Sequence, residues 1–211
     1  MEIISHRGYW KTAEEKNTME AFARSFRLGF GTETDIRDYR GQLVVSHDIP
    51  TEKSININDF LAAYKDSCTD GHLALNIKSD GLQKVLVQAL SEFRIKNYFI
   101  FDMSIPDTIE SIKYSLNIFS RYSEYECESG LWLQSKGIWY DNFGHNKIDI
   151  NFIENVLSRE MKICIVSDEL HRRNQSNQWR ILKSISNELL SSSNIILCTD
   201  HPEEAYEYFS Q

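Results

Sequence analysis

Short runs of β-branched and aromatic residues recur along the chain, and each run predicts a strand. They cover residues 2–5, 31–36, 42–47, 73–78, 98–103, 117–122, 137–142, 162–167 and 194–200. Several of these runs are apolar without alternation, which is typical of strands that are covered on both faces. The run at 42–47 follows the run at 31–36 through a Tyr-Arg-Gly turn, so we interpret it as an extra strand.

The segments between these runs carry apolar residues at three- and four-residue spacing, which predicts amphipathic helices. They cover residues 18–30, 81–93, 105–115, 150–160 and 178–192. Asn17–Thr18 offers an N-cap for the first helix, and Gly29 and Gly31 are candidates to end it.

Strand and helix alternate about eight times without a long gap, which favours a parallel α/β fold closed into a barrel. We therefore predict a trimmed TIM-type (β/α)8 barrel of parallel strands, forming a single domain over residues 1–211. An open doubly wound sheet is the alternative, although no glycine-rich phosphate loop follows the first strand.

Composition narrows the class of protein. The chain has 211 residues, of which 41% are hydrophobic and 26% charged, as in an ordinary soluble globular protein. Its formal net charge of −8 disfavours nucleic acid and anionic membranes as partners, but a bound metal could still attract a small phosphate substrate. Scattered cysteines, no visible signal peptide and no apolar stretch of about 20 residues predict a cytoplasmic protein without membrane insertion.

Polar residues cluster where the predicted strands end, which in a barrel is where chemistry gathers. The candidates are His6, Arg7, Glu33, Asp35, His47, Asn76 and Lys78, followed by Asp102, Arg121, Asp141, Glu169, Thr199 and Asp200. Strand period places Glu33 and Asp35 on one face. Two carboxylates there must bind a cation, pair with a base or shift their pKa values. Oxygen ligands suit Mg²⁺ or Ca²⁺.

Three stretches in order, SHRG, NTMEAFARSFRLGFGTETDI and LVVSHD, carry a family resemblance. The sequence resembles the glycerophosphodiester phosphodiesterases, whose pattern is HRG, a Pro-Glu-Asn-Thr stretch before a helix, an ExD pair, and an HD dipeptide ending a strand. Order and spacing match over residues 3–48. The later TDHPEEA is similar to the closing strand and helix of that family.

This resemblance implies a TIM-type barrel that hydrolyses a phosphodiester with a divalent cation and two histidines. His6 and His47 would form the acid–base pair, and Arg7 would hold a phosphate oxygen, with Lys78 as a second clamp. Glu33, Asp35 and Asn76 would ligate Mg²⁺ or Ca²⁺. The substrate would be a small glycerol- or sugar-linked phosphodiester, as in lipid metabolism.

Two departures from the family pattern bear on substrate and metal. The family usually has Glu-x-Lys on the third strand, where this chain has Asn76-Ile77-Lys78. An amide oxygen brings no charge, so we expect weaker metal binding. The Pro-Glu before Asn-Thr is Glu15-Lys16 here, which adds a positive charge near the site.

Several alternatives stay open from the sequence. The chain could bind a phosphorylated ligand without cleaving it, or could cyclise the diester as a lyase. Glu33 and Asp35 could pair with Arg7 and Arg37 without a metal, and Lys78 could be their structural partner. Asp48 is expected to be a turn residue, and His145, His171 and His201 are expected to be exposed. The sequence predicts neither the alcohol moieties nor the oligomeric state.

Overall fold

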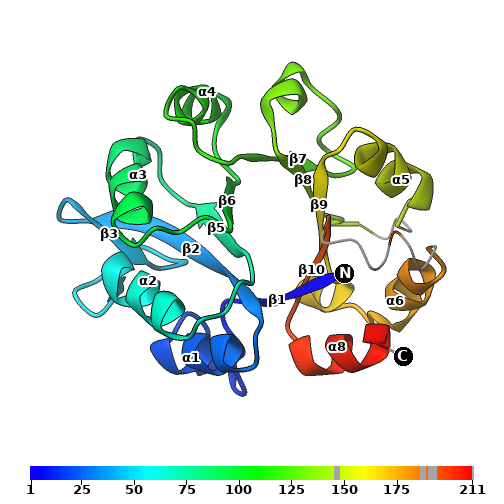
Figure 1. Ribbon diagram of the computed structural model, residues 1–211, viewed down its shortest axis with the longest axis horizontal. Helices are drawn as coiled ribbons and strands as arrows, with labels where there is room; N and C mark the ends of the chain where they lie inside the picture. Colours follow the sequence, from blue (N-terminus) through cyan, green and yellow to red (C-terminus); the bar gives the residue numbers. More distant parts are fainter. Residues whose placement is uncertain (145–147, 186–188, 190–193, 211) are drawn as a thin grey trace. The chain divides into compact units, whose positions relative to one another are not determined.

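A computed structural model describes residues 1–144, 148–185, 189 and 194–210 (Figure 1). The contacts divide the chain into two compact units. The N-terminal unit comprises residues 5–118, and the C-terminal unit comprises residues 1–4 and 119–211. The first strand, β1 (Glu2–His6), ends in the N-terminal unit. Each unit is described below by itself.

The N-terminal unit has a sheet in the order β4-β3-β2-β5-β6, in which β2, β5 and β6 are parallel. Its strands are β2 (Gly31–Tyr39), β3 (Gln42–Val45), β4 (Ile55–Asn56), β5 (Leu73–Ile77) and β6 (Tyr98–Phe101). Its helices are the 3-10 turn η1 (Ala13–Glu15) and α1 (Met19–Arg27), α2 (Ile57–Asp66), α3 (Gln83–Glu92) and α4 (Ile105–Lys113). The short strands β3 and β4 run antiparallel to their neighbours, as expected for a hairpin inserted after β2.

The C-terminal unit has parallel strands in the order β7-β8-β9-β10. They are β7 (Phe119–Tyr122), β8 (Gly137–Tyr140), β9 (Lys162–Val166) and β10 (Ile195–Thr199). The helices are α5 (Ile150–Ser158), α6 (Ser176–Lys183) and α8 (Pro202–Ser210), with 3-10 turns η2 (Gly130–Gln134) and η3 (Asp168–His171).

Every strand expected from the sequence contains an observed strand, and the predicted α/β class with mostly parallel strands is confirmed. One local prediction was wrong, because Gly31 begins β2 instead of ending α1. Helix α2 was not predicted, and the predicted helix over 178–192 overlaps α6 but extends into residues outside the described ones. The single domain over residues 1–211 stays a prediction. None of the helices that the structure describes is both long and apolar enough to cross a bilayer.

Helices α1, α2 and α3 share one apolar core with the sheet of the N-terminal unit. Phe22 and Phe60 lie with ring centroids 4.7 Å apart in an edge-to-face arrangement, and both are fully buried. Leu75 and Ile77 of β5 and Ile36 of β2 belong to the same core. Because strand side chains alternate, residues 33, 35 and 76 face the opposite side of the sheet.

The turn after β1 depends on a glycine. Gly8 has φ +79°, a conformation that side-chain-bearing residues rarely adopt, and its amide donates to Thr32 Oγ1. A Cβ at this position would lie 2.7 Å from Ala21 Cβ and 2.8 Å from the Ala21 carbonyl carbon. Helix α1 can therefore approach the end of β1 only if residue 8 is glycine.

We predict that Gly8→Ala lowers the free energy of unfolding more than Gly81→Ala does. Gly81 also has a positive φ, +85°, but a Cβ there would meet nothing within 4 Å. Gly81→Ala should cost about 1–2 kcal/mol of backbone strain. Gly8→Ala should cost at least about 1 kcal/mol more, because the added methyl group overpacks against α1. Urea unfolding of the full chain measures both, and equal losses would contradict this account of the turn.

Candidate functional site

The parallel pairing of β2 and β5 brings together the three residues expected to ligate a cation. Asp35 lies opposite Asn76 in the register, and Glu33 lies two residues earlier on the same face. All three side chains are buried, with Glu33 2% and Asp35 0% exposed. Isolated charges are costly to bury, so these carboxylates need compensation from neighbours or from a ligand.

Each of these residues has a side-chain oxygen that makes no hydrogen bond within the part of the chain that the structure describes. The atoms are Glu33 Oε2, Asp35 Oδ1 and Asn76 Oδ1. Buried acceptors without partners are rare in native proteins and destabilise the fold unless something satisfies them. Two carboxylate oxygens and one amide oxygen fit a hard cation such as Mg²⁺ or Ca²⁺.

The donor set is weaker than a cluster of acidic ligands. Among the described residues, no group of three or more His, Cys, Asp or Glu side chains is placed to hold a metal ion. The amide of Asn76 supplies an oxygen but no charge, so this set of ligands suits a cation held with modest affinity.

Asp35 is also the centre of a cluster of positive charges. Arg7 Nε lies 3.0 Å from Asp35 Oδ2, and Lys78 Nζ lies 3.5 Å from Asp35 Oδ1. The ion pair of Asp35 with Arg7 is thus present, whereas Arg37 donates instead to the backbone carbonyls of His47 and Lys78. Arg7 and Lys78 are each about one-fifth exposed, so both can also reach an anionic ligand.

Lys78 has a second acidic partner at the end of the next strand. Its Nζ lies 3.6 Å from Asp102 Oδ2. Asp102 follows β6 with φ +70°. This shared pairing holds the ammonium of Lys78 between Asp35 and Asp102.

The imidazole of His6 lies beside Glu33. His6 Nε2 is 3.9 Å from Glu33 Oε2, and the His6 side chain is 15% exposed. The backbone supports the same contact, because the amide of Arg7 donates to the carbonyl of Glu33 at 3.0 Å. His6 therefore lies against the carboxylate of Glu33 in the structure.

His47 follows β3 and is more open. The amide of Ser46 donates to the carbonyl of Asp35 at 3.0 Å, which places His47 next to the end of β2. Its side chain is 47% exposed, and its Nδ1 lies 2.8 Å from Asp48 Oδ1. A carboxylate at Nδ1 favours the tautomer with its proton there, which leaves Nε2 as the acceptor. Asp48, expected to be a turn residue, thus also orients His47.

The environment of Glu33 changes its acidity. Burial, and secondly the charge of Asp35, raise the pKa of Glu33 to about 7, against the opposing charges of His6, Arg7 and Lys78. A carboxyl group with this pKa is partly protonated at neutral pH. Cation binding would remove that proton, because only the carboxylate form is a ligand.

Asn17 is a site residue that sequence reasoning assigned only to helix capping. Its Nδ2 donates to Asp35 Oδ2 at 2.9 Å, its Oδ1 accepts from Thr34 Oγ1, and its amide donates to the carbonyl of Arg7. Thr18 is the actual cap of α1, since its side chain accepts from the amide of Ala21. The sequence feature that could have identified Asn17 as a site residue was the Asn-Thr pair of the family pattern.

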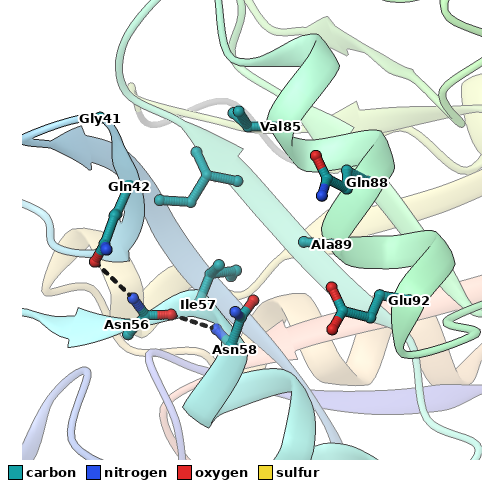
Figure 2. A pocket seen from close by; sticks show the side chains of 10 residues that line it. Gly41, Gln42, Asn56, Ile57, Asn58, Val85, Gln88, Ala89 and Glu92 are labelled. Carbon is teal, nitrogen blue, oxygen red and sulfur yellow. Dashed lines mark hydrogen bonds between the residues drawn. The ribbon is translucent and has the colours of Figure 1, made fainter.

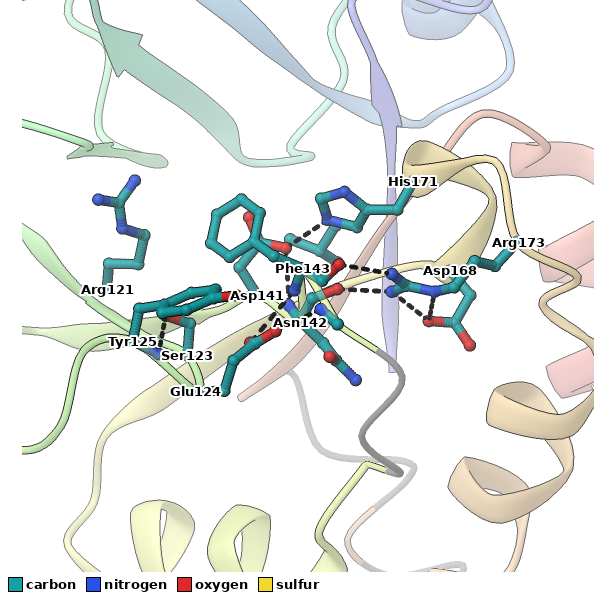
Figure 3. A network of polar contacts seen from close by, with 12 residues as sticks. Arg121, Ser123, Glu124, Tyr125, Asp141, Asn142, Phe143, Asp168, His171 and Arg173 are labelled. Carbon is teal, nitrogen blue, oxygen red and sulfur yellow. Dashed lines mark hydrogen bonds and ion pairs between the residues drawn. The ribbon is translucent and has the colours of Figure 1, made fainter.

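The remaining strand-end residues lie in the C-terminal unit and join polar networks there. Figure 3 shows the network that contains Asp141 and His171. Asp141 Oδ1 lies 2.6 Å from His171 Nε2, so His171 is half-buried and paired, not exposed as expected. Glu169 Oε1 accepts from Thr199 Oγ1 and from the amide of Asp200. His201 is exposed as predicted, and His145 lies outside the described residues.

A separate groove of about 190 Å³ lies in the N-terminal unit between the β3 hairpin, the start of α2 and α3 (Figure 2). Amide side chains at its rim bond to one another, for example Asn56 Nδ2 to Gln42 Oε1 at 3.1 Å. None of the candidate residues lines it, so the site proposed here does not coincide with this groove.

Comparisons with known proteins bear on the fold. No protein-family model and no curated protein matches the sequence. Among solved structures, a glycerophosphodiester phosphodiesterase from Parabacteroides distasonis aligns over 99% of this chain and 96% of its own, with a TM-score of 0.75 and 17% identity.

Two further structures are similar. A glycerophosphodiester phosphodiesterase from Agrobacterium tumefaciens covers 100% of both chains with a TM-score of 0.71 and 14% identity. A phosphodiesterase from Oleispira antarctica, solved with the product sn-glycerol-3-phosphate, covers 100% of this chain and 97% of its own, with a TM-score of 0.71 and 12% identity. The chain thus has an α/β fold with mostly parallel strands that matches the fold of these glycerophosphodiester phosphodiesterase structures.

Proposed function

We propose that this protein is a metal-dependent phosphodiesterase that hydrolyses a small glycerol- or sugar-linked phosphodiester by acid–base catalysis with His6 and His47. The observation that carries the proposal is the set of buried oxygens of Glu33, Asp35 and Asn76, next to His6, that make no hydrogen bond with any residue the structure describes. The shared fold with phosphodiesterases supports it.

The residues have separable roles in this proposal. A divalent cation held by Glu33, Asp35 and Asn76 would neutralise the charge of the diester. Arg7 and Lys78 bind the non-bridging phosphate oxygens, since Arg7 offers a planar fork of donors and Lys78 a point charge. Asn17 and the ion pairs of Asp35 hold this framework rigid, which lets the substrate bind in one orientation.

The two histidines move protons. One imidazole accepts the proton of the attacking water, and the other donates a proton to the departing alkoxide, because imidazole titrates near neutral pH. Asp48 orients His47, while Glu33 lies against His6. Each such partner typically contributes about 10²–10⁴-fold to the rate.

We predict that His6→Ala and His47→Ala each lower kcat on glycerophosphodiesters by at least about 10²-fold. His201→Ala is the matched control, because His201 is an exposed histidine in the C-terminal unit. Release of alcohol or glycerol phosphate with added Mg²⁺ or Ca²⁺ measures turnover, and circular dichroism verifies folding. Near-normal turnover in either site variant would refute the assignment of that histidine.

Cation binding should depend on pH through Glu33. Because the pKa of Glu33 is raised to about 7, protons compete with the cation below that pH. The apparent affinity for Mg²⁺ or Ca²⁺ should therefore fall by up to about tenfold per pH unit below pH 7 and level off above it. The shift in melting temperature caused by the cation measures this at several pH values.

Matched variants make the cation test specific. Glu33→Gln should remove most of the cation-induced shift, whereas Glu92→Gln, which changes an exposed carboxylate on α3, should keep it. Asn76→Asp adds a charge at nearly constant volume and should tighten binding. A shift that is insensitive to Glu33→Gln would place the cation elsewhere.

Cyclisation of the diester is the second candidate reaction, since a neighbouring substrate hydroxyl could replace water as the nucleophile. We predict hydrolysis: turnover in ¹⁸O-labelled water should put one solvent oxygen into the first phosphate product. A first product without label would assign the lyase reaction instead. Ligand-induced stabilisation without turnover under either cation would indicate a binding protein.

A further inference from the structure

The loop between β1 and α1 folds back onto the residues of the proposed site. Trp10 Nε1 donates to the carbonyl of His6 at 3.1 Å. At the other end of the loop, the amide of Asn17 donates to the carbonyl of Arg7 at 2.9 Å. The loop therefore begins and ends on the backbone of the HRG turn, and Lys16 directly precedes the residue that contacts Asp35.

Lys16 is held in place by an aromatic ring. Its Nζ lies 4.3 Å from the centroid of the Trp10 ring, whose indole is in turn fixed to His6. Both side chains are half-buried. A cation over the face of tryptophan is attracted by the ring electrons and loses part of its freedom before any ligand arrives.

The charge of Lys16 is not neutralised by its neighbours. Glu15 accepts from Arg24 Nη1 at 2.7 Å and from the amide of Lys11 at 2.8 Å, so this adjacent carboxylate is already engaged. Among the described residues, Lys16 forms no ion pair. Its cation–π contact leaves the ammonium free to donate to an anion.

The sequence departs from the family pattern at this position. The resemblance places a glutamate directly before Asn-Thr, where this chain has Lys16 before Asn17. The sign of the charge at this position is reversed, while the anchors at His6, Arg7 and Asp35 are in place. A reversed charge beside a binding site changes which substrates are stabilised there.

We propose that Lys16, seated on Trp10, is a specificity-determining residue that binds a second anionic group, a carboxylate or phosphate carried by one alcohol of the phosphodiester. This inference rests on the proposed phosphodiesterase function. Arg7 and Lys78, which contact Asp35, bind the diester phosphate itself. Lys16 directly precedes Asn17, which donates to Asp35. Lys16 therefore binds a different part of the substrate from the diester phosphate.

The test compares glycerophosphoglycerol with its analogues in which one glycerol is replaced by glycerate or by glycerol phosphate. Dissociation constants are measured calorimetrically with EDTA, and kcat/KM is measured with Mg²⁺. The wild-type protein should prefer an anionic analogue. Lys16→Gln should weaken binding of that analogue at least about tenfold more than binding of glycerophosphoglycerol. Lys16→Glu should reverse the preference.

Lys11→Gln is the matched control, because Lys11 lies in the same loop but contacts the hydroxyl and ring of Tyr9. It should leave the preference unchanged. An equal response of all three diesters to Lys16→Gln, or no measurable binding of any of them, would overturn the inference. If the analogues bind with the expected discrimination but none is cleaved, the proposed hydrolysis fails while the role of Lys16 stands.

Discussion

The buried carboxylate of Asp35 is the group on which the candidate site depends. It is fully buried, and Arg7, Lys78 and Asn17 converge on it from three separate segments of the N-terminal unit. A charge removed from water in this way is stable only when its partners stay in place, so the loss of one partner leaves the others strained or unpaired. The need to keep these partners around Asp35 fixes three segments relative to β2. They are the turn at residues 6–8, the end of β5 and the loop before α1.

The same cluster explains why the two carboxylates differ. Asp35 lies within 3.5 Å of the cationic groups of Arg7 and Lys78, whereas Glu33 lies 3.9 Å from the imidazole of His6. Burial and the neighbouring charge of Asp35 raise the pKa of Glu33 to about 7. Glu33 therefore changes protonation near neutral pH, which is the behaviour expected of a group that exchanges a proton for a ligand.

Much of the site was predictable because strand period and motif order are local properties. Alternation places Glu33 and Asp35 on one face, and the structure has them there, while the register of β5 against β2 adds Asn76 to that face. The partners of these groups were less predictable. Arg37 was expected beside the carboxylates but donates to two backbone carbonyls, and His171 was expected to be exposed but pairs with Asp141. Both depend on contacts between segments far apart in the sequence.

The sequence by itself determined where most of the strands and helices lie and that Glu33 and Asp35 share one face of their strand. These follow from periodicity, which acts over a few residues. Only the tertiary structure decided that Asn17 donates to Asp35, that Lys16 lies over the ring of Trp10, and that buried oxygens of Glu33, Asp35 and Asn76 lack hydrogen bonds among the described residues. Such facts arise from the packing of distant segments, whose geometry no local pattern contains.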